Sequence, residues 1–351
     1  MGIEIRLAWN PERIEEKKWE NIYLKTLELI DNYPAMSLKS EYHRGKKRLI
    51  LTRDVERNSG NKEKRFWEIC GNYETRTRGE SFKLYCKLNH YKKNNKNKDN
   101  SVKDEDLLFS FIDNERNYKY LFDSKTQGKD YQKLIIGIAS LIENEFPRAT
   151  LMAGNVDYRE VKKAVKWAGQ ILNMNIKIPV LYDKNRLTAR LNKKYKSYEI
   201  IKKAYLNYRG DTEDIFKIIF DKFDEKEIKN WYKNYLNERY DKAINPHAVK
   251  LYIIWLNITE DVNTLLRMMC VEEEGPKFEP EAALKALAST WAFVPEKYFN
   301  SILKMNKVEA EMENSAYKQI QSFFWNAMMM GRKIEVNLDI LIIFRLIKNL
   351  F

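Results

Sequence analysis

Strand-like alternation of apolar and polar residues stops at about residue 196 and does not return. Before that point, alternating segments are interspersed with segments of helical spacing, and after it only helical spacing recurs. The sequence therefore predicts an α+β class. We expect a mixed α/β domain with a small sheet over residues 1–196, followed by an all-α domain over residues 197–351 that folds as a helical bundle or a short solenoid.

The first predicted elements are a strand and a helix. Apolar side chains alternate with others from Ile3 to Trp9, as in a half-buried strand. Asn10 and Pro11 then give a helix start, because Asn is a good N-cap and Pro fits the first turn. Apolar residues at three- and four-residue spacing continue to the Tyr33-Pro34 pair, where the proline ends the helix.

Further strands are predicted at residues 48–55, 65–71, 82–88, 118–122, 149–153 and 176–182. A helix is predicted over residues 134–142, and another begins at Asp157, which with Glu160 resembles a capping box. Because this second helix lies between strands 149–153 and 176–182, the pattern predicts a right-handed strand–helix–strand crossover. The polar, low-complexity stretch 92–106 predicts a surface loop.

Helical spacing fills the remainder of the chain. The predicted helices cover residues 198–208, 212–223, 225–240, 248–256, 262–271, 279–292, 296–305, 309–330 and 338–351. The amphipathic segment 338–351 is expected either to pack on the rest of its own chain or to form a homo-oligomer contact, since its apolar face must be covered.

The positive charge of the chain is unevenly distributed. The net charge is +13, from 63 Lys and Arg against 50 Asp and Glu. Residues 1–200 hold 41 of those cations and 28 of those acids, whereas residues 201–351 hold 22 of each. The whole excess therefore lies in the N-terminal part, where we expect an acidic partner to bind.

Two basic stripes give the main functional prediction. The first lies on the helix that begins at Asp157, with cations at i, i+3, i+4 and i+7 on one face, and the second lies on the next helical segment. The predicted partner-binding residues are Arg159, Lys162, Lys163, Lys166, Arg186, Arg190, Lys193 and Lys194. Phosphates or an acidic protein surface would neutralise these cations, so the partner is nucleic acid or an acidic protein. The alternative is an ordinary solvated face, since basic runs of this kind are common in lysine-rich proteins. No sequence motif for reading bases is present.

A metal-dependent nuclease is the second hypothesis. Asp113 precedes an Asp-x-Lys formed by Asp123 and Lys125, the order in which many Mg²⁺-dependent nucleases place two metal-binding carboxylates and a lysine that assists the attacking water. The Pro-Asp expected at the first carboxylate is missing. Short Asp-x-Lys matches also arise by chance in a chain this rich in both residues.

Other chemistry lacks its motifs. Gly128-Lys129 is followed by Asp130, which excludes a P-loop, and the three cysteines and three histidines form no zinc pattern. We therefore expect no cofactor, with Mg²⁺ needed only if the nuclease hypothesis holds. No apolar run approaches the ~20 residues of a membrane span, so we expect a cytoplasmic protein without a membrane partner.

The first hypothesis is accordingly a non-enzymatic bacterial interaction protein, in the setting of a defence or toxin-immunity system. The third is a structural subunit of a larger assembly.

Overall fold

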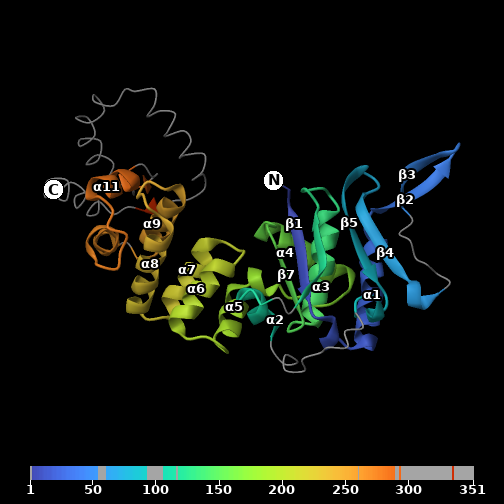
Figure 1. Ribbon diagram of the computed structural model, residues 1–351, viewed down its shortest axis with the longest axis horizontal. Coiled ribbons are helices and arrows are strands. Elements are labelled where there is room, and N and C mark those ends of the chain that lie inside the picture. Colours follow the sequence, from blue (N-terminus) through green and yellow to red (C-terminus); the bar gives the residue numbers. More distant parts are fainter. Residues whose placement is uncertain are drawn as a thin grey trace. The chain divides into compact units, whose positions relative to one another are not determined.

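The computed structural model describes residues 2–53, 61–92, 106–115, 118–259 and 261–288, together with two-residue strands at 292–293 and 334–335. The chain forms two compact units, Met1–Ile215 and Phe216–Phe351 (Figure 1). The first holds two antiparallel sheets with helices and the second is mainly helical, so the predicted α+β class with a helical C-terminal part is confirmed. Compactness alone does not define a folding domain, and the predicted boundary after residue 196 stays a prediction.

The first sheet of the N-terminal unit has three antiparallel strands in the order β6-β1-β7. The central strand is β1 (Glu4–Trp9), which pairs with β6 (Lys119–Lys125) on one side and with β7 (Thr150–Gly154) on the other. Ile5 and Leu7 are fully buried, as the alternation predicts.

Helices pack in layers on this sheet. α3 (Gln132–Glu145) contacts β1 and β7, and both α1 (Glu16–Asp31) and α4 (Tyr158–Ile171) contact α3. Asn10 caps as predicted, but the turn it begins is a short 3-10 helix, Pro11–Arg13, and α1 starts after it. α4 is thus an outer helix, one side of which is left to solvent.

The second sheet has four strands in the order β3-β2-β4-β5. β4 (Phe66–Asn72) and β5 (Thr77–Tyr85) form its buried part, and α2 (Leu107–Ile112) follows them along the chain. β2 (Ala35–His43), which the sequence pattern does not predict, pairs with β4 only through its first two residues. From there it continues with β3 (Lys46–Thr52) as a two-stranded ribbon.

The predicted strand at residues 176–182 is wrong. The segment has no regular structure until a 3-10 turn at Val180–Tyr182. Pro179 has no N–H to donate to a neighbouring strand, and the backbone amides of two other residues of the segment donate to side chains instead. The amide of Lys177 donates to Asn144 Oδ1 at 3.1 Å, and that of Val180 to Glu143 Oε1 at 2.7 Å. The predicted strand–helix–strand crossover is therefore also wrong.

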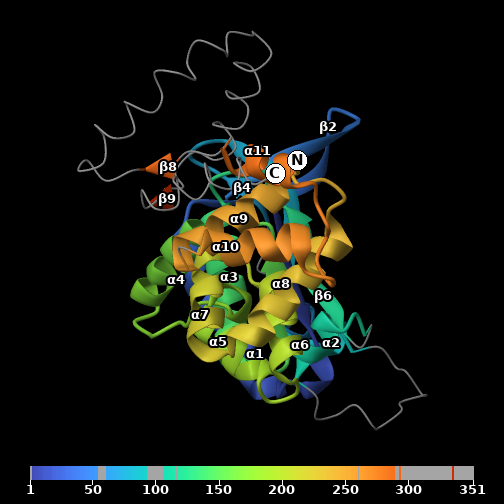
Figure 2. The same cartoon turned by 90° about the vertical axis from the view of Figure 1, so that its left-hand side faces the viewer.

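Helices run from the end of the first unit through the second. The helices α5 (Lys184–Leu191) and α6 (Ser197–Asn207) belong to the first unit, and α7 (Thr212–Lys222) crosses the division. In the second unit, seen in front in Figure 2, the helical elements are α8 (Glu225–Arg239), α9 (Pro246–Thr259), α10 (Val262–Leu266), a π-helical turn at Arg267–Val271 and α11 (Pro280–Ala288).

The core of the second unit is aromatic. Phe216, Trp231, Tyr232 and Trp255 are almost completely buried, and their rings make tilted and edge-to-face contacts at centroid distances of 4.9–6.4 Å. A two-residue parallel pair, β8 (Ala292–Phe293) and β9 (Ile334–Glu335), completes the described part.

Several predictions fall outside the described residues. These are the helices 296–305 and 309–330, the oligomer-contact segment 338–351, and most of the surface loop 92–106.

Candidate nucleic-acid interface

The exposed face of α4 is the candidate site. Asp157 caps the helix by accepting a 2.7 Å hydrogen bond from the amide of Arg159, and apolar residues at helical spacing fix which side is buried. The buried residues are Val161, Ala164, Val165 and Ala168. The opposite side carries four exposed cations, Arg159, Lys162, Lys163 and Lys166. The structure therefore brings the whole first stripe together on one surface, as its spacing predicts.

The described part of the chain does not neutralise the cations of this α4 face. None of the four makes an ion pair among the residues that the structure describes. The one acid on α4, Glu160, is turned toward the neighbouring helix, where its carboxylate accepts a 2.6 Å hydrogen bond from Gln132 Nε2. Like charges at i, i+4 destabilise a helix by about 0.2–0.5 kcal/mol per pair. An acidic partner that binds these cations would relieve their mutual repulsion.

Aromatic rings lie beside these charges. Lys162 Nζ is 4.5 Å from the ring centroid of Tyr158, and on the adjacent α3 Lys133 Nζ is 5.2 Å from that of Trp167. Cations held over rings keep their charge and lose some freedom of movement, which favours a prearranged positive surface.

The second stripe is mostly engaged inside the molecule. Arg190 forms a two-pronged ion pair with Asp106, with side chains only 12% and 9% exposed, and Lys194 pairs with Asp113 at 3.2 Å. Arg186 donates to the carbonyl of Ile178. Lys193 is exposed. The two stripes thus differ: the first presents its charge to solvent, whereas the second uses most of its charge to hold α5 in place.

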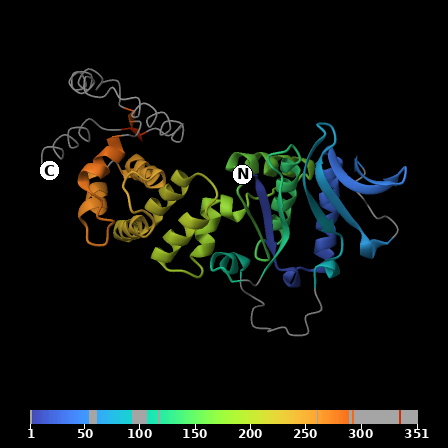
Figure 3. The ribbon, with the colours of Figure 1, turned by 45° about the horizontal axis from the view of Figure 1, so that its top comes forward.

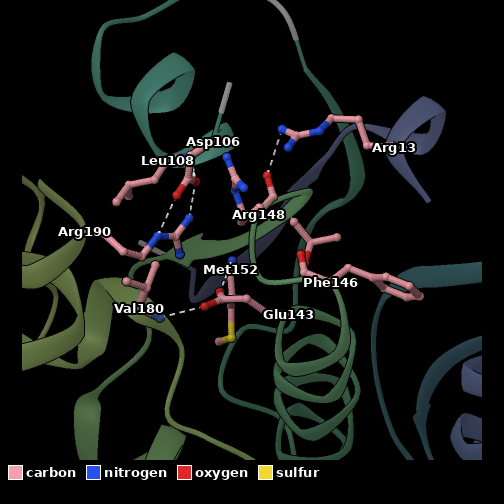
Figure 4. A network of polar contacts seen from close by, with 10 residues as sticks. Arg13, Asp106, Leu108, Glu143, Phe146, Arg148, Met152, Val180 and Arg190 are labelled. Atoms are coloured by element: carbon pink, nitrogen blue, oxygen red, sulfur yellow. Dashed lines mark hydrogen bonds and ion pairs between the residues drawn. The ribbon is translucent and has the colours of Figure 1, made fainter. Parts of the chain in front are cut away.

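A buried polar network lies under α5 (Figure 4). Glu143, on α3, is completely buried, and its two carboxylate oxygens accept 2.7 Å hydrogen bonds from the amides of Met152 and Val180. Burial raises the pKa of Glu143, although these amides and the charges of Arg190 and Arg186 act in the opposite direction. The network joins β7 to the segment before α5, which is a structural role.

Asp113, the first residue of the nuclease hypothesis, has three partners on other elements. Besides Lys194, it accepts a 2.7 Å bond from Tyr195 Oη and one of 2.7 Å from Lys203 Nζ, on α6. Partial burial alone would raise the pKa of the Asp113 carboxyl, but the hydrogen bonds from Lys203, Tyr195 and Lys194 outweigh it and lower the pKa to about 2.

The other two nuclease candidates lie on β6. Asp123 and Lys125 share one face of the strand, two residues apart. Asp123 pairs with Arg6 of β1 at 3.0 Å, and the amide of Lys125 donates to Glu80. Asp113 shares no partner with them, and within the described ranges no group of three Asp, Glu, His or Cys side chains is arranged to hold a metal ion. The contacts add nothing to the nuclease hypothesis, which stays a prediction.

A second exposed basic surface was not predicted. It lies on the ribbon of β2 and β3, whose cations are Lys39, Arg44, Lys46, Lys47 and Arg48. The signal in the sequence is the run Arg44-Gly45-Lys46-Lys47-Arg48, in which a glycine that permits a tight turn is surrounded by cations. Because Arg rather than Asn or Asp precedes the glycine, the usual hairpin signature is absent.

Comparison with known proteins gives no relative: no family model, no curated protein and no solved structure matches the chain. Among the described helices, none combines the length and apolar character needed to cross a membrane.

Proposed function

We propose that the N-terminal unit binds nucleic acid through the exposed face of α4. The observation that carries this proposal is the set of four exposed cations, Arg159, Lys162, Lys163 and Lys166, with no ion pair among the described residues. A phosphate backbone neutralises such a surface and releases its condensed counterions, which drives binding without any base contact.

The distribution of charge supports the same partner. The excess of +13 lies in residues 1–200, and α4 has its single acid directed toward Gln132 rather than toward the basic face. Of the second stripe, Lys193 is exposed, while Arg190 and Lys194 already have carboxylate partners. The proposal therefore concerns α4 first, without base-specific recognition.

The test is binding of the full-length protein to fluorescent single- and double-stranded DNA and RNA, followed by anisotropy between 50 and 200 mM salt. The α4 variant carries Lys162→Glu, Lys163→Glu and Lys166→Glu. Its matched control carries the same change at three exposed lysines of the second unit, Lys222, Lys226 and Lys242. We expect the α4 variant to bind more weakly and the slope of log Kd against log salt to fall by about three, at about 0.9 for each phosphate contact.

Two outcomes contradict the proposal. One is the absence of salt-sensitive binding by the wild-type protein to any of the four nucleic acids, in which case binding to polyglutamate would indicate an acidic protein as the partner. The other is equal loss of affinity in the α4 variant and its control, which would assign binding to net charge alone. Shortening of the labelled strand only when Mg²⁺ is added would support the nuclease hypothesis.

A further inference from the structure

The ribbon formed by β2 and β3, here called the arm (residues 38–51), projects from the N-terminal unit, as Figures 1 and 3 show. Only Ala35 and Met36 of β2 pair with β4, so from Leu38 onward each strand pairs only with the other among the described strands. At about 3.4 Å per residue, the stretch from Leu38 to His43 extends roughly 17 Å. Residues 40–51 of the arm are all exposed, so its side chains are available to a partner.

The charge of the arm is strongly positive. Residues 38–51 contain five Lys and Arg and one acid, Glu41, for a net charge of +4. None of these five cations makes an ion pair among the residues described. An acidic partner is therefore the one that the arm complements.

The pairing register divides the arm into two faces. One face carries three cations, Lys39, Lys46 and Arg48, with His43, Ile50 and the acid Glu41 opposite Arg48, because directly opposed residues share a side and successive residues alternate. The other face carries Leu38, Tyr42, Lys47, Leu49 and Leu51. Tyr42 and Leu49 are 79% and 60% exposed, so this face presents apolar side chains, beside Lys47, that the described residues do not cover. Cations beside exposed apolar side chains match a groove, where phosphates flank base edges and sugars.

The turn at the tip has a conformation that its sequence does not favour. Arg44 and Gly45 both have positive φ, 51° and 73°, the pattern of a type I′ turn. Glycine adopts this conformation freely, but arginine does so at a cost that Asn would lower. Lysines along the strands are enough to prevent edge-to-edge aggregation. Arg44 in the turn does not serve that purpose, so its unfavourable backbone conformation suggests another role for its charge.

From these observations we infer that the arm enters the major groove of double-stranded DNA, with its cations directed to the phosphates that border the groove. A two-stranded ribbon fits the groove width of about 12 Å, and the length of the arm exceeds the groove depth of about 8.5 Å. The deep, narrow major groove of duplex RNA does not admit such a ribbon, so the arm distinguishes the two duplexes. This inference rests on the proposed nucleic-acid binding and specifies duplex DNA as the ligand of the arm.

The experiment uses the full-length protein with a labelled 20-base-pair DNA duplex, the matching RNA duplex and the single DNA strand, in anisotropy titrations over a range of salt. The arm variant carries Lys46→Gln, Lys47→Gln and Arg48→Gln, and its control carries Lys222→Gln, Lys226→Gln and Lys242→Gln. We expect the arm variant to bind duplex DNA at least tenfold more weakly, with a salt slope lower by about two to three, while the control matches wild type. Duplex RNA and the single strand should respond far less.

A single substitution separates folding from binding. Arg44→Asn suits the positive φ of the turn, so the hairpin should remain intact by circular dichroism and thermal unfolding. We expect it nevertheless to lower the salt slope for duplex DNA by about one.

The possible results separate the two proposals. If wild type binds DNA but the arm variant binds it with an unchanged Kd and slope, the arm inference is wrong and the α4 proposal stands. If the wild-type protein prefers duplex RNA or single strands, the groove inference is wrong although nucleic-acid binding holds. If it binds no nucleic acid at low salt, both proposals fail.

Discussion

Replacing Asp113 with asparagine should destabilise the N-terminal unit at neutral pH, with a loss that shrinks in acid. The carboxylate accepts hydrogen bonds from Lys194, Tyr195 and Lys203, and so connects the end of α2 to α6 and to the residues after α5. Asparagine has nearly the same shape but no charge, so the substitution removes the electrostatic attraction and leaves the packing in place.

The size of the effect follows from the pKa. The pKa of Asp113 falls from 3.8 to about 2 on folding. At about 1.36 kcal/mol per pH unit, this difference gives roughly 2.4 kcal/mol at pH 7 as an upper bound, and the 22% exposure of the side chain reduces the expected loss to about 1–2 kcal/mol. Because the folded-state pKa is depressed, this stability is present in full above pH 4 and is lost as pH falls through 2, so roughly half of it remains at pH 3.

The assay is urea unfolding of wild type and Asp113→Asn at pH 7 and pH 3. The matched control is Asp123→Asn, which breaks the pair with Arg6, 44% exposed at the carboxylate, and should cost at most about 1 kcal/mol. An Asp113→Asn protein as stable as wild type at pH 7, or a loss that does not decrease at pH 3, would refute the proposed structural role of this carboxylate.

Three further predictions concern buried or surface charges. Arg190→Ala leaves a buried carboxylate without its partner and should cost about 3–5 kcal/mol in thermal or urea unfolding, whereas Lys193→Ala should stay within about 0.5 kcal/mol. Glu143→Gln can accept only one of the two amide hydrogen bonds and should cost about 1–3 kcal/mol at neutral pH. The folded pKa of Glu143 is raised, so wild-type stability should fall as pH rises through that pKa, and the variant should lack this dependence in unfolding curves across pH 4–8. Lys162→Glu places an acid four residues before Lys166 and should leave the free energy of unfolding unchanged or raise it by about 0.5 kcal/mol, while weakening DNA binding in anisotropy titrations.

The sequence predicts those helices and strands whose formation depends on residues close to them in the chain. The alternation from Ile3 to Trp9 is β1, and the Asp157 cap and its apolar stripe are α4. The exposed cations of α4 follow from the same spacing, because a helix with one buried side must present the other.

The remaining features depend on residues far away in the sequence. The apolar run at 176–182 reads as a strand, and only the buried carboxylate of Glu143 and the amide of Asn144, both on α3, explain why its amides do not join a ladder. The carboxylates that neutralise Arg190 and Lys194 lie 84 and 81 residues earlier in the chain, so their charges look free in the sequence. Both faces of the arm are exposed, so its sequence lacks the alternation of apolar and polar residues that marks a strand with one buried face.

The central claim is that the unpaired cations of the N-terminal unit form a nucleic-acid surface, and the most direct measurement is the salt slope of duplex DNA binding in a combined variant. This variant neutralises the α4 and arm lysines together, at Lys162, Lys163, Lys166, Lys46 and Lys47, each replaced by Gln. We expect its slope to fall by about four to five relative to wild type, at about 0.9 for each of the five lysines, and affinity at 150 mM salt to be lost. A combined variant that binds duplex DNA with the wild-type affinity and slope would contradict the claim.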